Sequence, residues 1–188
     1  MEILKIANSK VRKELLNFYF INSKKQFYLR ELERILKFPV ANIRRELIKL
    51  EKIGLFRSER KGNLLYYSLN TSYQLYKEIK SIVSKTSGLP VVLKESLRKV
   101  KGIEIALIYG SFARGEERSS SDIDLFIIGK VEETCLVNTL NSLEKKLQRE
   151  INPAVYERKD FEKKKENPFF LDVLKSPKIF IIGDKSGL

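Results

Sequence analysis

The segment from Gly110 to Leu125, GSFARGEERSSSDIDL, combines side chains that can bind phosphate with side chains that can bind a divalent cation. Asp122 and Asp124 are separated by one residue, so an extended chain would direct both carboxylates to one side, with Cα atoms roughly 6–7 Å apart. Mg2+ prefers carboxylate oxygens and commonly shares its coordination shell with substrate phosphates. The spacing therefore indicates a magnesium site, and two such ions could act together on a phosphate ester.

The first half of this segment has the features of an anion site. Gly110 permits a sharp exit from the apolar run at residues 103–109, and Ser111 could begin a short helix. Free backbone N–H groups at a helix start, together with a serine hydroxyl, bind phosphate. Arg114 could neutralise further phosphate charge. Taken singly, a Gly-Ser pair is more often a plain turn and Asp-x-Asp a solvated strand entry, so the prediction depends on their occurring together.

Three parts of the segment, Gly110-Ser111, Ala113-Arg114-Gly115 and Ser121 to Leu125, resemble the signature of the DNA polymerase beta-like nucleotidyltransferase superfamily. The likeness is greatest to its minimal nucleotidyltransferase domains and covers roughly residues 89–188. It implies a small mixed sheet with helices on one side and transfer of a nucleoside monophosphate to a hydroxyl of a protein, an RNA end or a small molecule. The implied residues are Gly110, Ser111, Arg114 and Ser121 for a nucleoside triphosphate, with Asp122 and Asp124 as catalytic ligands of Mg2+.

Members of that superfamily usually carry a third carboxylate on a later strand, where it is both a metal ligand and a base. The candidate strand here is residues 151–156, and Asn152 stands at the position in question. An amide carries no charge and cannot take a proton as a carboxylate does. Two interpretations therefore stay open. The domain is an active transferase, or it is a non-catalytic regulator that senses nucleotide or pairs, like an antitoxin, with a toxin-like partner.

The charge of the chain is concentrated in its first half. The 188 residues carry a formal charge of +13, and residues 1–88 hold 19 basic and 8 acidic side chains, a net charge of +11. Residues 89–188 hold 18 and 16, a net charge of +2. This asymmetry indicates a nucleic-acid-binding half joined to a more neutral half. A composition adapted to heat would explain abundant charge, but not its one-sided sign.

Several classes of protein are not expected from the composition. No apolar run approaches the roughly 20 residues of a membrane helix, and residues 1–20 lack the core of a signal peptide. Cys135 is the only cysteine and histidine is absent, so neither an internal disulfide nor a structural zinc site is expected. These features favour a cytoplasmic protein without membrane partners.

The first half has the pattern of three helices and a hairpin. Helices are predicted over residues 1–22, 30–36 and from Pro39 to Gly54, with a short strand at 27–28. Strands at 55–59 and 64–69 are joined around Lys61-Gly62-Asn63, where glycine and asparagine suit a positive φ. This order resembles a winged helix-turn-helix domain, common in transcriptional regulators, over roughly residues 1–85.

That resemblance implies that the third helix enters the major groove of DNA and that the hairpin contacts the backbone. The implied contact residues are Asn42, Arg44, Arg45, Arg57, Arg60 and Lys61. Alternatively, these are ordinary solvated charges and the domain binds protein. A further helix at 71–85, with Leu75, Ile79, Ile82 and Val83 on one face, makes a homodimer a reasonable hypothesis, unless that face packs on its own domain.

The sequence therefore predicts an α+β chain with two domains, a winged helix-turn-helix at residues 1–87 and a nucleotidyltransferase-like domain at 88–188. In the second, a helix begins near Pro90, and strands are expected at 103–109, 125–128, 151–156 and 178–182. Helices are expected at 132–149 and 169–175, with a charged, solvated helix face between 159 and 167. The predicted function is a DNA-binding regulator that carries a site for Mg2+ and a nucleoside triphosphate.

Overall fold

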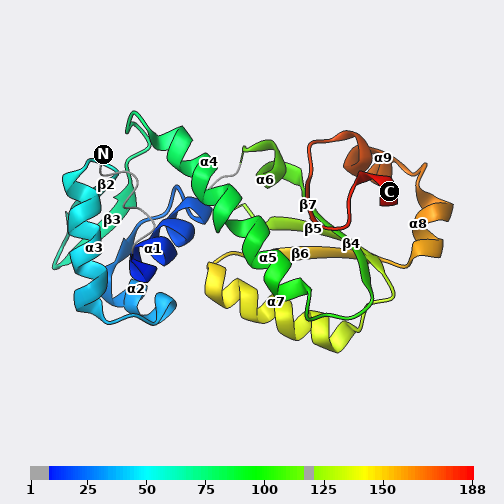
Figure 1. Ribbon diagram of the computed structural model, residues 1–188, viewed down its shortest axis with the longest axis horizontal. Coiled ribbons are helices and arrows are strands. Elements are labelled where there is room, and N and C mark those ends of the chain that lie inside the picture. Colours follow the sequence, from blue (N-terminus) through cyan, green and yellow to red (C-terminus); the bar gives the residue numbers. More distant parts are fainter. Residues whose placement is uncertain (1–8, 117–120) are drawn as a thin grey trace. The chain divides into compact units, whose positions relative to one another are not determined.

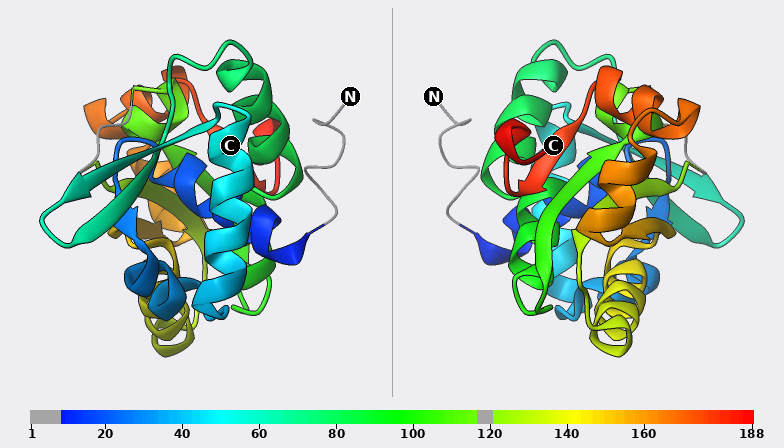
Figure 2. Two further views of the ribbon diagram at one scale, coloured as in Figure 1. Left: turned by 90° about the vertical axis from the view of Figure 1, so that its left-hand side faces the viewer. Right: turned by 90° about the vertical axis from the view of Figure 1, so that its right-hand side faces the viewer.

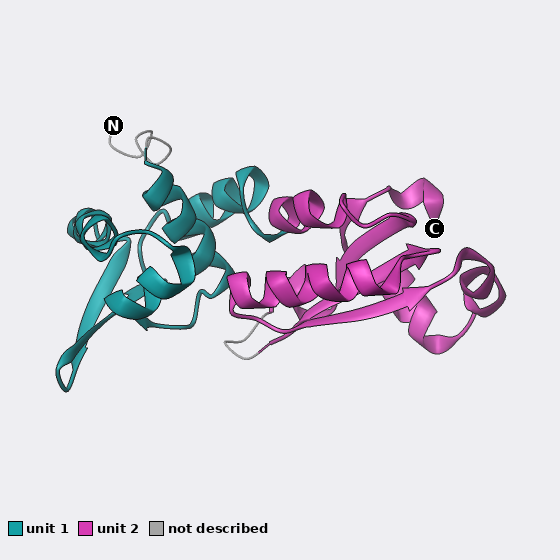
Figure 3. Cartoon of the chain, turned by 90° about the horizontal axis from the view of Figure 1, so that it is seen from below, with its two compact units in different colours: residues 1–89 teal, residues 90–188 magenta. Residues whose placement is uncertain are grey.

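Two small sheets, each packed with helices, account for the described residues, 9–116 and 121–188, of the computed structural model. The first eight residues of the predicted helix 1–22, and residues 117–120 of the GSFARGEERSSSDIDL segment, lie outside the described residues. The chain divides into two units, residues 1–89 and 90–188 (Figure 3). No helix of the described part is long and apolar enough to cross a membrane.

Unit 1 consists of helices and a small antiparallel sheet with strand order β1-β3-β2 (Figure 1). Its elements are α1 (Lys10–Ile21), β1 (Phe27–Tyr28), α2 (Leu29–Leu36), α3 (Val40–Lys52), β2 (Phe56–Lys61), β3 (Leu64–Leu69) and α4 (Tyr76–Thr86). The predicted order of helices and strands is confirmed.

The core of unit 1 lies between α1, α3 and the sheet. Leu15 and Tyr19 of α1 and Leu47 of α3 have no solvent-exposed surface, because the amphipathic faces of the two helices pack on each other. The Tyr19 hydroxyl donates to the carbonyl of Tyr67 at 3.1 Å, which satisfies a polar group that would otherwise be costly to bury.

The face of α4 that suggested a homodimer packs largely within its own unit. Ile79 and Val83 are buried in the core of unit 1, and the rings of Tyr76 and Phe20 lie 5.5 Å apart. Ile82 alone of the predicted stripe keeps a large exposed fraction, 52%. A homodimer stays a prediction.

The β2–β3 hairpin protrudes from the rest of unit 1 (Figure 2). Its strands pair from Phe56 with Leu69 to Lys61 with Leu64, so Gly62 and Asn63 form a two-residue loop. Gly62 has φ +58°, whereas Asn63 is not among the described residues with positive φ. The expectation that both residues would use positive φ was therefore wrong for Asn63, and the glycine alone permits the turn.

Unit 2 is built on a four-stranded mixed sheet with strand order β6-β5-β4-β7. The β5–β6 pair is parallel, and β4 runs antiparallel to β5 and to β7. The elements are α5 (Leu89–Leu97), which starts at the boundary, β4 (Ile103–Tyr109), α6 (Gly110–Arg114), β5 (Ile123–Gly129), α7 (Glu133–Leu147), β6 (Ile151–Tyr156), α8 (Arg158–Lys164), α9 (Pro168–Lys175), β7 (Ile179–Ile182) and a final 3-10 turn, η2 (Lys185–Gly187).

Helices cover both faces of this sheet. Phe126 and Ile128 pack against Phe161 of α8 and Phe170 of α9 on one face. Side chains alternate along a strand, so the equally buried Ile127 faces the other side. There, side chains of α7 border a groove with Pro153 and Val155 of β6. The expectation of helices on one side only was therefore wrong, because apolar residues in successive positions of β4 and β5 require cover on both faces.

Candidate functional site

Three strand ends meet at one end of the unit 2 sheet. In the strand register, Tyr109 at the end of β4 is the partner of Asp124, and Asp124 is the partner of Asn152 near the start of β6. Register partners project from the same face of a sheet. Asp122, one residue before β5, lies beside them because its carboxylate contacts the Asn152 side chain. The face of the register partners also carries Phe126, and it is hence the face on which α8 and α9 pack.

The Asn152 side chain contacts the first aspartate of the pair. Its Nδ2 donates to Oδ2 of Asp122 at 3.0 Å. The position where the family resemblance implied a third carboxylate is thus beside the other two, and an amide occupies it. Glu157 and Asp160, the two acidic residues that follow β6 most closely in the sequence, lie after the opposite end of that strand.

Gly110 lies directly against the second aspartate. Its φ is +69°, a conformation in which other residues are strained, and a Cβ at this position would overlap Oδ2 of Asp124 and lie 3.0 Å from its Cγ. The glycine that opens α6 therefore allows the strand-to-helix turn to approach the carboxylate closely. This contact brings the predicted phosphate turn and the predicted metal ligand together.

The two aspartates form an electrostatically unfavourable pair in the absence of a cation. Burial and then the charge of Asp122 raise the pKa of Asp124, and Arg114 partly opposes this. Burial, Asp124 and Tyr156 likewise raise the pKa of Tyr109. Two half-buried carboxylates with like charges favour a divalent cation, and water and phosphate oxygens can fill the other positions of an octahedral Mg2+ shell. The residues present therefore fit Mg2+.

A larger acidic cluster is absent from the described part of the chain. Within residues 9–116 and 121–188, no group of three or more histidine, cysteine, aspartate or glutamate side chains is placed to hold a metal. Among the described residues, Asp122 and Asp124 thus form a pair of carboxylates rather than part of a larger acidic cluster, and the amide of Asn152 adjoins them.

Arg114 lies at the exposed end of α6 and pairs with a neighbour. Its Nε donates to Oε2 of Glu116 at 2.8 Å, and this pair, with smaller contributions from Asp172 and Asp124, raises the pKa of Arg114. The guanidinium therefore lies within electrostatic range of the carboxylates. An exposed pair of this kind is weak, so a phosphate could displace Glu116.

Ser121 and Ser111 are half-buried at the two ends of the segment. The carbonyl of Ser121 accepts a hydrogen bond from Nη1 of Arg149, an arginine that is only 5% exposed. Arg149 therefore holds the chain that enters β5 and so helps to place Asp122. Sequence reasoning missed Arg149, because nothing in the pattern distinguishes a buried arginine at a helix end from a solvated one.

Comparisons with known proteins give one match whose residues lie within unit 2. Residues 92–182 match the family model described as Polymerase beta, Nucleotidyltransferase. Unit 2 contains a polymerase beta-like nucleotidyltransferase domain. No curated protein matches the chain. A solved structure described as the crystal structure of the toxin-antitoxin with AMP-PNP matches with a TM-score of 0.38 and 12% identity, over 50% of this chain and 73% of that chain.

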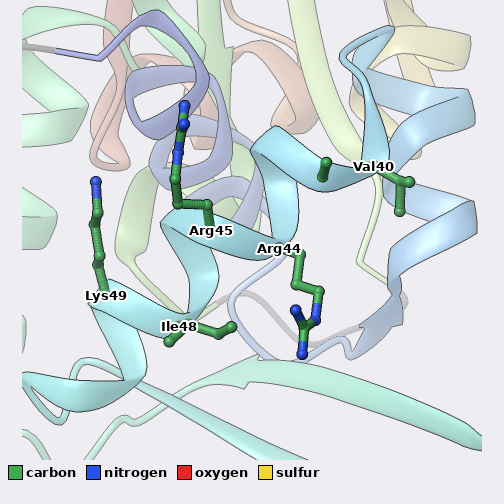
Figure 4. Close-up of a pocket in the computed structure, with 6 residues that line it drawn as sticks. Val40, Arg44, Arg45, Ile48 and Lys49 are labelled. Carbon is green, nitrogen blue, oxygen red and sulfur yellow. The ribbon is translucent and has the colours of Figure 1, made fainter.

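In unit 1 the predicted DNA-contact residues of α3 lie on its exposed side. Arg44 and Arg45 are exposed, and with Val40, Ala41, Ile48 and Lys49 they border a shallow hollow. Arg44 points the opposite way from Arg45 and Lys49 (Figure 4). Asn42 is half-buried, and its Oδ1 lies 3.5 Å from Nη2 of Arg45.

The three predicted contact residues of the hairpin do not share one face. Ser58 donates to Glu51 of α3, so the face of β2 that carries Ser58 also carries Arg60 and turns toward α3. Arg57 and Lys61 project from the opposite face, where Nζ of Lys61 lies 3.5 Å from Glu59 and 5.9 Å from the Tyr66 ring. The pleat thus places only Arg60 of the three on the side of α3.

Proposed function

We propose that unit 2 binds a nucleoside triphosphate together with Mg2+ and transfers its nucleoside monophosphate to a hydroxyl acceptor. The observation that carries the proposal is the close approach of Gly110 to Asp124, with Asp122 beside them through its contact with Asn152, the register partner of Asp124. It joins a turn suited to phosphate to a pair of carboxylates suited to Mg2+. The match to the nucleotidyltransferase family supports the same reaction class.

The residues have separate roles in this proposal. Asp122 and Asp124 hold Mg2+, which when bound neutralises charge on the phosphates. Gly110 and Ser111 bind the phosphates through backbone N–H groups and the Ser111 hydroxyl. Ser121, near the other end of the segment, also contacts the nucleotide. Arg114 exchanges Glu116 for phosphate as the nucleotide arrives.

In the reaction, the oxygen of the acceptor hydroxyl forms a bond to the α-phosphorus as the bond from that phosphorus to the bridging oxygen breaks. Pyrophosphate leaves, and the proton of the hydroxyl passes to solvent. Asn152 cannot accept that proton, and a positioned base typically contributes about 10²–10⁴-fold to rate. Slow turnover is therefore expected.

A second candidate function is a regulator that binds nucleotide, or a toxin-like partner protein, without turnover. The specific observation that favours it is the hydrogen bond from Asn152 to Asp122. The Asn152 amide can neither accept the proton of the acceptor hydroxyl nor add negative charge for a second cation. A site for one Mg2+ and a triphosphate could therefore persist after catalysis was lost.

For unit 1 we propose DNA binding, with α3 as the element that enters the major groove and the hairpin beside it. Support comes from the net charge of +11 in residues 1–88 and from the exposure of Arg44, Arg45 and Arg60. A DNA-binding unit joined to a nucleotide-binding unit would be a regulator whose activity depends on nucleotide.

Incubation with each of the four ribonucleoside triphosphates, labelled at the α-phosphate, tests the transfer reaction in the presence of Mg2+. The proposal expects label on an acceptor, or on the protein itself, with matching release of pyrophosphate. Both should be lost in the double variant Asp122→Ala, Asp124→Ala. Label bound without pyrophosphate release would favour the regulator, and transfer that persists in the double variant would refute the metal assignment.

A further inference from the structure

We propose that the ring of Phe169 is the platform on which the nucleobase of the bound triphosphate stacks. The inference rests on the function proposed for unit 2 and adds a base subsite to it. Phe169 belongs to α9, outside the GSFARGEERSSSDIDL segment, and the sequence alone gave no reason to connect it with the aspartates.

The position of Phe169 follows from its aromatic neighbours. Its ring centroid lies 6.0 Å from that of Tyr109, 6.3 Å from Phe126 and 6.5 Å from Tyr156. Tyr109 is the register partner of Asp124, and Phe126 is the next residue on the same face of β5. Phe169 therefore packs over the strand positions that adjoin the carboxylates.

The same helix also borders the phosphate side of the site. Asp172, three residues after Phe169 on α9, lies close enough to Arg114 for its charge to raise the pKa of that arginine. The first five residues of α9 are thus near both the end of α6 and the end of β4. A triphosphate held at α6 and the aspartates would have its ribose and base beside this helix.

Phe169 differs from its neighbours in exposure. It is 38% exposed, whereas the adjacent Phe170 is 3% exposed and fills the core. The Phe169 ring contacts other aromatic rings, and the exposed part of the residue stays accessible to a ligand. Aromatic rings stack on any nucleobase because every base has a π-face, and purines offer the larger area.

The start of α9 restrains the backbone that carries this ring. Asn167 caps the helix by accepting a hydrogen bond from the backbone N–H of Phe169 at 3.1 Å, and Pro168 restricts the first helical residue. A pre-positioned ring loses little freedom when a base stacks on it. The geometry therefore favours a stacking site for a nucleobase on this ring.

Calorimetry with two ligands separates the base from the phosphates. Mg2+ with ATP and Mg2+ with inorganic tripolyphosphate are titrated separately into the wild-type protein and into the variants Phe169→Leu, Phe169→Tyr and Leu171→Ala. Wild-type protein should bind ATP about tenfold more tightly than tripolyphosphate, the contribution of one stacked base. Phe169→Leu should lose that preference while its affinity for tripolyphosphate stays unchanged, and Phe169→Tyr should retain it.

Leu171→Ala is the matched control, because Leu171 lies on the same helix and is 36% exposed. It should change neither affinity. Equal affinity for the two ligands in the wild type would overturn the base platform, and so would an equal loss of both in Phe169→Leu, which would give the ring a structural role. Absence of binding by either ligand would instead refute the proposed function of the site.

Discussion

The Asn152 amide donates a hydrogen bond to Asp122 at 3.0 Å, so a neutral group adjoins the two aspartates at the position where the family resemblance implied a third carboxylate. This relationship gives a gain-of-function prediction. Asn152→Asp should tighten Mg2+ binding by adding a charged ligand and should accelerate nucleotidyl transfer by about 100-fold or more, because a carboxylate can accept the acceptor proton. Calorimetry and pyrophosphate release measure the two effects.

Asn152→Ala is the control for that substitution, since it removes the hydrogen bond and adds no carboxylate. It should increase neither the affinity for Mg2+ nor the rate of nucleotidyl transfer. In the absence of Mg2+, Asn152→Asp should lower the melting temperature, because a third negative charge joins two others. A folded Asn152→Asp protein that binds Mg2+ and transfers nucleotide no better than the wild type would count against the assignment of this position.

A pH-dependent stability effect is expected from Asp124. Burial and Asp122 raise its pKa in the folded state above the ordinary value of about 3.9, so the fold favours the protonated form. Its stabilising contribution is therefore complete below the unfolded pKa and is lost as pH rises through the folded pKa. Asp124→Asn should raise the melting temperature at pH 7 without divalent cations, and the difference should disappear near pH 3.

Thermal melts with Mg2+ complete that test. The cation should stabilise the wild type and leave Asp124→Asn unchanged. Asp160→Asn, which neutralises an exposed carboxylate after the far end of β6, should keep the full response to Mg2+. Equal stabilisation of all three proteins by Mg2+ would show that the cation binds elsewhere.

Two glycines allow the close approach of Gly110 to Asp124 to be tested. Gly110 and Gly115 both have positive φ, +69° and +73°, but a Cβ at Gly115 would meet no atom of the described residues within 4 Å. Gly115→Ala should lower the free energy of unfolding by about 1 kcal/mol through backbone strain. Gly110→Ala should lower it further and abolish Mg2+ binding, because its methyl group displaces the Asp124 carboxylate.

Chemical denaturation measures both glycine variants, and calorimetry measures their Mg2+ binding. Equal destabilisation by the two substitutions, with Mg2+ binding retained in Gly110→Ala, would mean that the Gly110 contact with Asp124 has no functional role.

The faces of the hairpin give a test of DNA binding. Arg60 lies on the side of α3, and Arg57 lies on the opposite face. Arg60→Ala, like Arg44→Ala and Arg45→Ala, should weaken binding to duplex DNA and reduce the salt dependence by about one unit of slope. Arg57→Ala removes the same charge and should have a smaller effect.

Fluorescence anisotropy at several salt concentrations measures these affinities. If α3 and the hairpin face that carries Arg60 form the interface, Arg60→Ala should weaken binding more than Arg57→Ala. This difference separates the loss of a direct contact from the loss of one unit of net charge. Identical losses in Arg57→Ala and Arg60→Ala would indicate a diffuse electrostatic attraction, and an affinity independent of salt would exclude phosphate contacts.

Local patterns were sufficient to predict much of the fold. The strands at residues 103–109 and 151–156 have the predicted bounds, since each is a short run between clear turn signals. β3 also has the predicted bounds, residues 64–69, because Gly62 forms the turn that precedes it. The spacing of Asp122 and Asp124 likewise indicated a shared direction without knowledge of the fold.

Features that depend on contacts between distant segments could not be predicted. The hydrogen bond from Asn152 to Asp122 joins residues that are 30 positions apart, and it exists because of the β5–β6 register. The position of Phe169 beside Tyr109 depends on how α9 packs on the sheet. The division of the hairpin cations between two faces required the exact pairing of β2 with β3.

The most direct test of the central claim is calorimetry of ATP binding with and without Mg2+. The arrangement of Asp122, Asp124 and Gly110 predicts one site per chain that requires Mg2+ and is lost in the double variant Asp122→Ala, Asp124→Ala. ATP binding that is independent of Mg2+, or that persists unchanged in a folded double variant, would contradict a nucleotide site at this end of the sheet.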